Sequence, residues 1–153
     1  MLIVGAFAVV HAKPSKKVAM FRGAAALYMI ITGIVFSLLL SGLDNVALTA
    51  VPWDNVVLHY IMPIVLLVDW LVDRPAKALS FKQSLVWLIY PAVYVIYSLI
   101  RGALVGWYPY PFLNPETMGY LIVVSTSVGI LVLSIALVWV LSKLSASNKP
   151  LLR

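Results

Sequence analysis

The sequence predicts an all-α fold, a polytopic transmembrane helix bundle with four full spans and a partial N-terminal helix. Two features of the composition lead to this prediction, since 63% of the 153 residues are hydrophobic and only 10% are charged. Soluble domains carry about 25% charged residues, so this chain has too few charges to cover a water-exposed surface. The third observation is a set of four segments with 18 or more mostly apolar residues, close to the ~20 residues that a bilayer span requires.

The predicted helices follow one another with short connections, so residues 1–153 are expected to form one integral membrane domain. Residues 1–12 are apolar, but a helix of that length covers only ~18 Å of a hydrocarbon core that is ~30 Å thick. They are therefore expected to be the remaining part of a longer helix. The four full spans are predicted at residues 18–42, 54–72, 84–102 and 119–144.

The connections between these spans alternate in charge, and this alternation predicts their orientation. Residues 13–17, residues 73–83 and the tail after residue 142 are rich in Lys and Arg, whereas the other two connections are not. Basic loops remain in the cytoplasm, so the C-terminus is predicted to be cytoplasmic and Met1 to face outward. The same loops account for the net charge of +6, and no nucleic-acid partner is expected.

His59 is the first candidate for chemistry. It lies in the second full span, ~7.5 Å from the end that is predicted to face outward. Ionisable side chains inside a membrane are costly and usually functional, so His59 is a candidate catalytic base. The alternative is a structural histidine that bonds a neighbouring helix. Asp69, near the cytoplasmic end of the same span, is interpreted mainly as an end anchor beside Trp70.

The third full span carries a polar stripe. Tyr90, Tyr94, Tyr97 and Arg101 follow the spacing i, i+4, i+7 and i+11, which places them on one face of a helix. Tyrosines that only mark the membrane interface would gather at the helix ends. The stripe is therefore expected to face the bundle interior or a polar cavity, and a face used only for packing is the alternative.

Polar side chains from four helices fall at one predicted depth. Counted inward from the outer ends, Ser37, His59, Tyr97, Ser125 and Thr126 all lie ~7–10 Å below the surface. A histidine base, a hydroxyl nucleophile and donors to an oxyanion at one level would suit acyl transfer. Hydroxyl groups also hold transmembrane helices together, and this second interpretation stays open.

The connection from Gly106 to Pro115 contains three prolines, at positions 109, 111 and 115. It also contains four aromatic residues, Trp107, Tyr108, Tyr110 and Phe112. The prolines keep it out of helix, and three of its four aromatic residues suit the headgroup region. It is interpreted either as an interfacial anchor or as a cap over a pocket that opens toward the outer leaflet.

A single pocket is predicted to combine these features. His59, Tyr97 and Arg101 are expected to share it, with Trp107 to Phe112 as its lid. Arg101 could hold a fatty-acid carboxylate through paired hydrogen bonds, and the alternative is that it extends to lipid headgroups. Trp107 and Tyr110 complete the predicted substrate-binding residues. The two histidines lie on different segments, cysteine is absent, and no phosphate or dinucleotide fingerprint occurs, so no metal and no cofactor are predicted.

These segments resemble a known family. The resemblance is carried by His59 followed by Pro63 and Leu66, by the string Trp107–Leu113, and by the following helix, which contains Ser125-Thr-Ser. These features are similar to the androgen-induced membrane proteins, in particular to a bacterial six-pass branch. The resemblance covers residues 1–145. It implies an intramembrane threonine hydrolase of fatty-acid esters of hydroxy fatty acids, with His59 at the position of the family histidine. It also implies a bacterial inner-membrane location.

The family threonine lies on an early helix, upstream of the point at which this chain begins, and no residue here matches its motif. Relatives also begin with an additional helix, so an N-terminally truncated chain is expected. The first functional hypothesis is a lipid-ester hydrolase with His59 as the base, whose nucleophile is either the missing upstream threonine or a substitute such as Ser37 or Thr126. The second is a non-catalytic membrane scaffold or lipid-binding subunit. Both hypotheses have membrane lipids as partners, and the first adds a fatty-acyl ester substrate.

Overall fold

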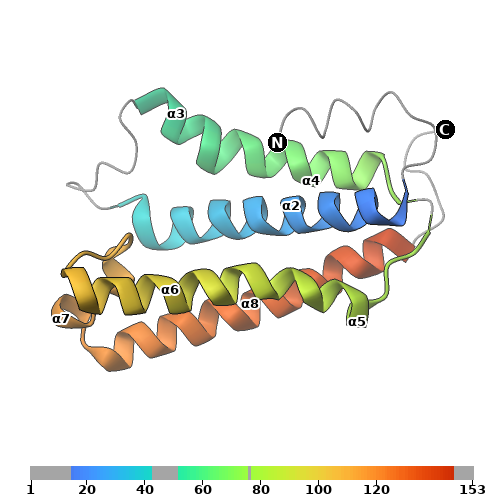
Figure 1. Ribbon diagram of the computed structural model, residues 1–153. Coiled ribbons are helices and arrows are strands. Elements are labelled where there is room, and N and C mark those ends of the chain that lie inside the picture. Colours follow the sequence, from blue (N-terminus) through green and yellow to red (C-terminus); the bar gives the residue numbers. More distant parts are fainter. Residues whose placement is uncertain (1–14, 43–51, 76, 147–153) are drawn as a thin grey trace.

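The computed structural model describes residues 15–42, 52–75 and 77–146, and within these ranges it contains helices and no strand (Figure 1). The first span consists of α2 (Lys16–Val35) and a π-helical turn, η1 (Phe36–Leu40). The second consists of α3 (Pro52–Val56), a π-helical turn, η2 (Val57–Ile61), and α4 (Met62–Val72). The third consists of α5 (Phe81–Ser84), a 3₁₀ turn, η3 (Leu85–Leu88), and α6 (Ile89–Val105). A 3₁₀ turn, η4 (Pro111–Leu113), and α7 (Pro115–Met118) precede the last span, α8 (Tyr120–Ala146).

Four of the described helices are long and apolar enough to cross a membrane, and the chain is accordingly a multi-pass membrane protein with an all-α fold. Their bounds are Lys16–Leu40, Trp53–Val72, Phe81–Val105 and Tyr120–Ser145. These bounds confirm the four predicted spans, and no predicted boundary differs by more than three residues. The partial helix predicted at residues 1–12 lies outside the described residues.

Local sequence explains where several elements begin and end. The Ser80 hydroxyl accepts a hydrogen bond from the Gln83 amide at the start of α5, and Asn114 Oδ1 accepts one from the Glu116 amide at the start of α7. Such caps satisfy the amides that the first helical turn leaves unpaired. Gly106 ends α6 with φ +68°, a left-handed conformation that glycine adopts without steric cost.

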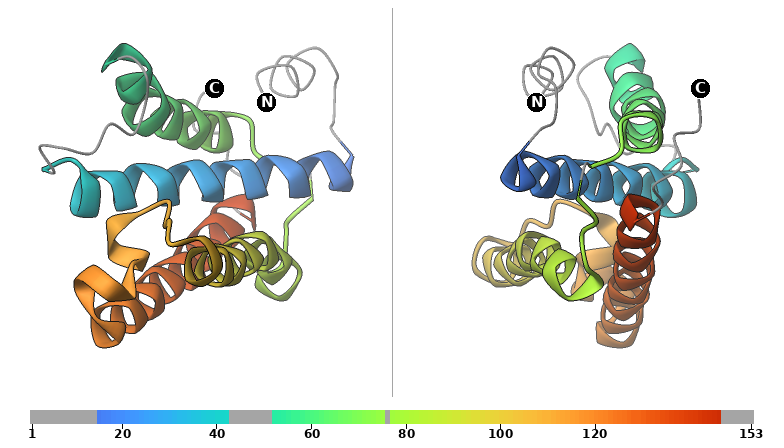
Figure 2. Two further views of the ribbon diagram at one scale, coloured as in Figure 1. Left: turned by 60° about the vertical axis from the view of Figure 1, so that its left-hand side comes forward. Right: turned by 90° about the vertical axis from the view of Figure 1, so that its right-hand side faces the viewer.

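Helix α2 lies at the centre of the bundle. In Figures 1 and 2 it runs between α3 and α4 on one side and α6 and α8 on the other. The apolar part of its span is 39% buried, compared with 11–17% for the other three spans. The outer helices therefore present most of their apolar surface to lipid, and α2 is the element around which they pack.

One end of the bundle, called here the Arg22 end, has a closely packed core. Leu27, Trp70, Trp87 and Val138 are almost fully buried there, and the rings of Trp70 and Trp87 meet edge to face with centroids 6.3 Å apart. The indole of Trp70 donates a hydrogen bond to the Leu141 carbonyl at 3.2 Å. This bond joins α4 to α8, so Trp70 both fills the core with its ring and links two helices through its indole N–H.

An ion-pair cluster at the same end joins α2 to α4. The Arg22 side chain is buried, and its two terminal nitrogens lie 2.8 Å from Asp69 Oδ2 and 2.8 Å from Asp73 Oδ2. Arg22 also donates to the Asp73 carbonyl at 2.9 Å. Asp69 is therefore more than the end anchor that the sequence indicated, because it neutralises a buried guanidinium on the neighbouring helix.

Close helix contact at the middle of the bundle depends on Gly33. A Cβ atom at this position would lie 2.9 Å from Pro63 Cγ and 3.1 Å from the His59 carbonyl oxygen. Small residues let transmembrane helices approach in this way. The contact fixes the π-helical turn that carries His59 against α2, and so positions the site described next.

Candidate functional site

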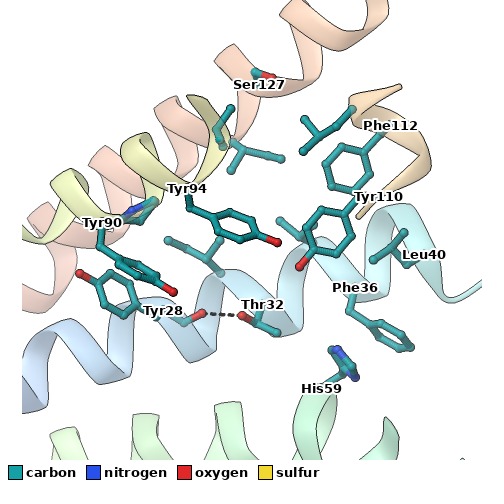
Figure 3. A pocket seen from close by; sticks show the side chains of 16 residues that line it. Tyr28, Thr32, Phe36, Leu40, His59, Tyr90, Tyr94, Tyr110, Phe112 and Ser127 are labelled. Atoms are coloured by element: carbon teal, nitrogen blue, oxygen red, sulfur yellow. Dashed lines mark hydrogen bonds between the residues drawn. The ribbon is translucent and has the colours of Figure 1, made fainter. Parts of the chain in front are cut away.

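A cavity of about 370 Å³ lies between α2, the η2 turn, α6, the 106–114 connection and α8. Its polar lining comprises four tyrosines with Thr32, His59 and Ser127, and Figure 3 shows them around one space. No charged side chain is among its lining residues. A cavity of this size and character is typical of sites for small, mostly apolar ligands.

A small packed cluster forms one wall of the cavity, at what is called here the Phe112 end of the bundle. It consists of Phe36, Leu40, Phe112 and Leu113, and all four line the cavity. Of the residues predicted to form a lid, Tyr110 and Phe112 line the cavity. Trp107, by contrast, is 57% exposed and is not one of the lining residues.

His59 is held by its own helix. Its Nδ1 lies 3.0 Å from the carbonyl oxygen of Asn55, one turn earlier. A carbonyl can only accept a hydrogen bond, so Nδ1 carries the proton and Nε2 of the neutral ring is an acceptor. The ring stacks on Phe36, with centroids 4.2 Å apart and planes 20° from parallel. This arrangement fixes a histidine that can accept a proton at the cavity wall.

Two π-helical turns face each other at this point. Phe36 begins η1 and His59 lies within η2, so the stacked pair joins the two turns. A π turn inserts one extra residue into a helix and is found mostly at functional positions. Neither turn was predicted from the sequence, because five residues that are mostly apolar have the same pattern in a π turn as in an α-helix.

Tyr94 and Tyr110 approach from opposite walls, and Figure 3 shows their hydroxyl groups directed toward the space between them. Their rings are 6.5 Å apart, and the Tyr110 ring stacks on Phe112 at 5.2 Å. Burial, followed by the interaction with Tyr94, raises the pKa of Tyr110 to about 12. Its phenol therefore remains a neutral hydrogen-bond donor at physiological pH.

Three other hydroxyl groups of the cavity are held by the main chain. Tyr28 donates to the Trp87 carbonyl at 2.9 Å, Thr32 to the Tyr28 carbonyl at 2.8 Å, and Ser127 to the Val123 carbonyl at 2.7 Å. These bonds fix the side chains and leave their oxygen lone pairs as acceptors. These hydroxyl groups therefore determine the shape and polarity of the cavity wall.

A second, more open cavity of about 350 Å³ lies against the opposite face of α2, and we call it the α2–α4 groove. It is lined by α2 and η1 on one side and by η2 and α4 on the other, including Gly33, Ile34, Ser37, Pro63 and Ile64. His59 lines this groove as well as the first cavity. Ser37, a candidate nucleophile, thus shares a wall with the candidate base.

The remaining predicted site residues lie elsewhere. Neither Tyr97 nor Arg101 lines either cavity; Tyr97 is 58% exposed, and the Arg101 guanidinium stacks on the Trp107 ring, 4.8 Å from its centroid. The polar stripe of α6 therefore divides, with Tyr90 and Tyr94 at the cavity and the other two residues beyond it. Thr126 also lies outside both linings, whereas its neighbour Ser127 lines the first cavity.

Several residues that line the first cavity could not be identified as site residues from the sequence. Tyr28, Thr32 and Phe36 stand in an apolar span whose periodicity does not separate an interior face from a lipid-facing one. The contact between Arg22 and Asp69 was predictable from the sequence. The two residues lie on successive antiparallel helices, each about one turn from the end that is predicted to face the cytoplasm. Over the part of the chain that the structure covers, no group of three His, Asp or Glu side chains is placed to hold a metal ion.

Comparison with known proteins adds no assignment, because no protein-family model, no curated protein and no solved structure matches the chain.

Proposed function

We propose that this membrane protein hydrolyses acyl esters of membrane lipids, with His59 as the general base. The observation that carries the proposal is the hydrogen bond between His59 Nδ1 and the Asn55 carbonyl, which leaves Nε2 as an acceptor at the wall of an uncharged cavity. A site inside a membrane protein, with no charged side chain in its lining, favours lipid-soluble ligands. Among these, an ester offers a carbonyl carbon for which a base and hydrogen-bond donors are useful.

In the proposed reaction, Nε2 of His59 takes the proton from a hydroxyl group as its oxygen attacks the ester carbonyl. The carbon–oxygen bond to the alcohol then breaks, and the imidazolium returns the proton to the departing alkoxide. Ser37 is the proposed attacking hydroxyl because it lines the α2–α4 groove together with His59. Water then releases the acyl group from Ser37.

The proposal includes a place in the cell. The family resemblance implies a bacterial cytoplasmic membrane, and the basic connections and tail favour a C-terminus in the cytoplasm. In this orientation the Arg22 end lies at the cytoplasmic side, and the first cavity lies toward the outer half of the bilayer. Its substrate would then be drawn from the outer leaflet.

The test is turnover of a neutral long-chain ester by the purified protein in lipid nanodiscs. We expect His59→Ala to lower the rate by ~10²–10⁴-fold, the contribution of a general base, and Ser37→Ala to abolish labelling by a lipophilic fluorophosphonate. Leu58→Ala is the matched control, since Leu58 precedes His59 and lines neither cavity. Turnover that is unaffected by His59→Ala would refute the proposal.

A second candidate, a lipid-binding subunit without catalysis, is favoured by one observation. Three of the cavity hydroxyls donate to main-chain carbonyls, which suits a rigid binding wall more than a reaction centre. This candidate predicts saturable binding of a radiolabelled fatty-acid ester without any turnover, in the wild-type protein and in His59→Ala alike.

A further inference from the structure

The two cavities meet at one side chain. Helix α2 separates them: Ile31, Thr32 and Val35 face the first cavity, whereas Gly33 and Ile34 face the α2–α4 groove. Of all the residues that line these two spaces, His59 alone is common to both. The imidazole therefore stands in the wall between the tyrosine-lined cavity and the more open groove.

The groove lies on the part of the surface that faces lipid. Its edges include Leu38 and Ile64, which are 76% and 61% exposed, and both belong to helices that are long and apolar enough to cross a membrane. In a bilayer, the molecules in contact with such side chains are acyl chains. An apolar groove between two of these helices therefore fits a single acyl chain.

The His59 side chain can move without loss of the contact between α2 and α4. His59 stacks on Phe36 by ring contact, and its hydrogen bond is to its own helix. The helix contact that holds α2 against α4 is made one turn away, by Gly33 against Pro63. A rotation of the imidazole would thus open the wall while that contact remains.

We infer that an acyl chain passes laterally from the bilayer along the α2–α4 groove into the tyrosine-lined cavity, and that the His59 side chain, stacked on Phe36, is the gate between them. The inference rests on the proposed function only for the choice of an acyl lipid as the ligand. It gives His59 a steric role that is separate from its role as a base.

The test uses a palmitic acid analogue with a diazirine at the end of its chain, in vesicles of phosphatidylethanolamine and phosphatidylglycerol. After illumination, the modified residues of the full chain are identified by mass spectrometry. For the wild type we expect modification of groove residues such as Ile34 and of cavity residues such as Ile31 and Val95. His59→Trp should lower cavity modification about tenfold, which corresponds to ~1.4 kcal/mol of steric cost, and leave groove modification in place.

Leu58→Trp is the matched control, because it adds the same bulk one residue away, outside both cavities; cavity modification should persist in it. His59→Ala tests the opposite direction and should raise cavity modification although it removes the proposed base. Cavity modification that is equal in wild type, His59→Trp and His59→Ala would overturn the gate. So would a groove that is never modified, which would mean that another part of the chain or a second copy covers it.

The two proposals fail in different ways. If the gate is correct and hydrolysis is not, His59 variants change cavity modification while no ester is turned over by the wild type. If hydrolysis is correct and the gate is not, His59→Ala loses turnover while modification of Ile31 and Val95 stays at the wild-type level.

Discussion

Arg22 illustrates how a single charged side chain is accommodated in this bundle. Its guanidinium is buried, yet two carboxylates and a main-chain carbonyl meet it at 2.8–2.9 Å. Removal of a partner from a buried charge leaves a desolvated ion, which costs more than the pair contributes when intact. The stability of the α2–α4 contact should therefore depend on both aspartates.

The variant Asp69→Asn/Asp73→Asn should lower the free energy of unfolding by ~3–5 kcal/mol, the cost of an uncompensated buried charge. Each single variant should cost less, because one carboxylate remains and both are partly exposed. The measurement is an SDS unfolding titration in mixed micelles. Glu116→Gln serves as the control for loss of an exposed charge, and a double variant as stable as this control would contradict the prediction.

Tyr110 gives a prediction for pH. Its pKa in the folded protein is raised to about 12, above the ordinary value of 10.0, so the folded state retains the phenolic proton longer than the unfolded chain. The resulting stabilisation is complete below pH 10 and is lost as the pH rises from there to about 12. Thermal unfolding of wild type and Tyr110→Phe across this window should show a steeper loss for the wild type. Parallel curves would exclude a buried phenol at this position.

The sequence indicated which residues are candidates for a polar site, but it did not show which of them are enclosed by neighbouring helices. The assignment of His59 and Tyr110 to a polar site is compatible with the cavity, but helical spacing alone could not show which face of α6 is buried. The buried residues of α6 are Ser98 and Gly102, which lie beside the tyrosine stripe, and Tyr97 on the stripe is 58% exposed. Which part of a stripe is enclosed depends on the neighbouring helices, and no local pattern records their position.

The helices themselves were predictable because membrane spans require long apolar segments. The interruptions within them were not. The π turns at Phe36–Leu40 and Val57–Ile61 and the 3₁₀ turn at Leu85–Leu88 arise where side chains of adjacent helices meet. These are consequences of packing between elements, and each element alone would continue as an α-helix.

Gly33 provides the prediction for this scale. Gly33→Ala would place a methyl group 2.9–3.1 Å from Pro63 and from the His59 backbone, so α2 and α4 must separate, at a cost of ~1–3 kcal/mol. Gly129→Ala, in α8, meets no atom within 4 Å and should be neutral or stabilising because alanine favours helix. The two variants are compared by SDS unfolding titration. Equal stabilities would show that the close contact is absent.

The molecule as a whole is tied more firmly at one end than at the other. The Arg22 end has its ion pairs, two buried tryptophans and the bond from the Leu79 amide to the Ser145 hydroxyl at 2.9 Å. The Phe112 end encloses the cavity. Amide hydrogen exchange should accordingly be slower over residues 22–27 of α2 than over residues 36–40, in nanodiscs at one pH. Uniform protection along this span would contradict the asymmetry.

Orientation is the other prediction for the whole chain. Because basic segments stay in the cytoplasm, a reporter fused at the C-terminus should be active as a cytoplasmic reporter, and one fused after Asn114 should behave as exported. The measurement is a paired phosphatase and fluorescent-protein fusion at each site. An exported C-terminal fusion would show that charge does not set the topology here.

The ion pairs at the Arg22 end also have a consequence for synthesis on the ribosome. Arg22 precedes Asp69 by 47 residues, and elongation proceeds at ~5–20 residues per second, so the arginine emerges about 2–9 s before its first partner. During this interval its long side chain can reach the aqueous interface near the start of α2. Only when α4 arrives does the guanidinium acquire counter-charges that let it withdraw. The order of translation therefore means that α2 is inserted early, whereas its final packing with a paired Arg22 is reached only after α4 has been inserted.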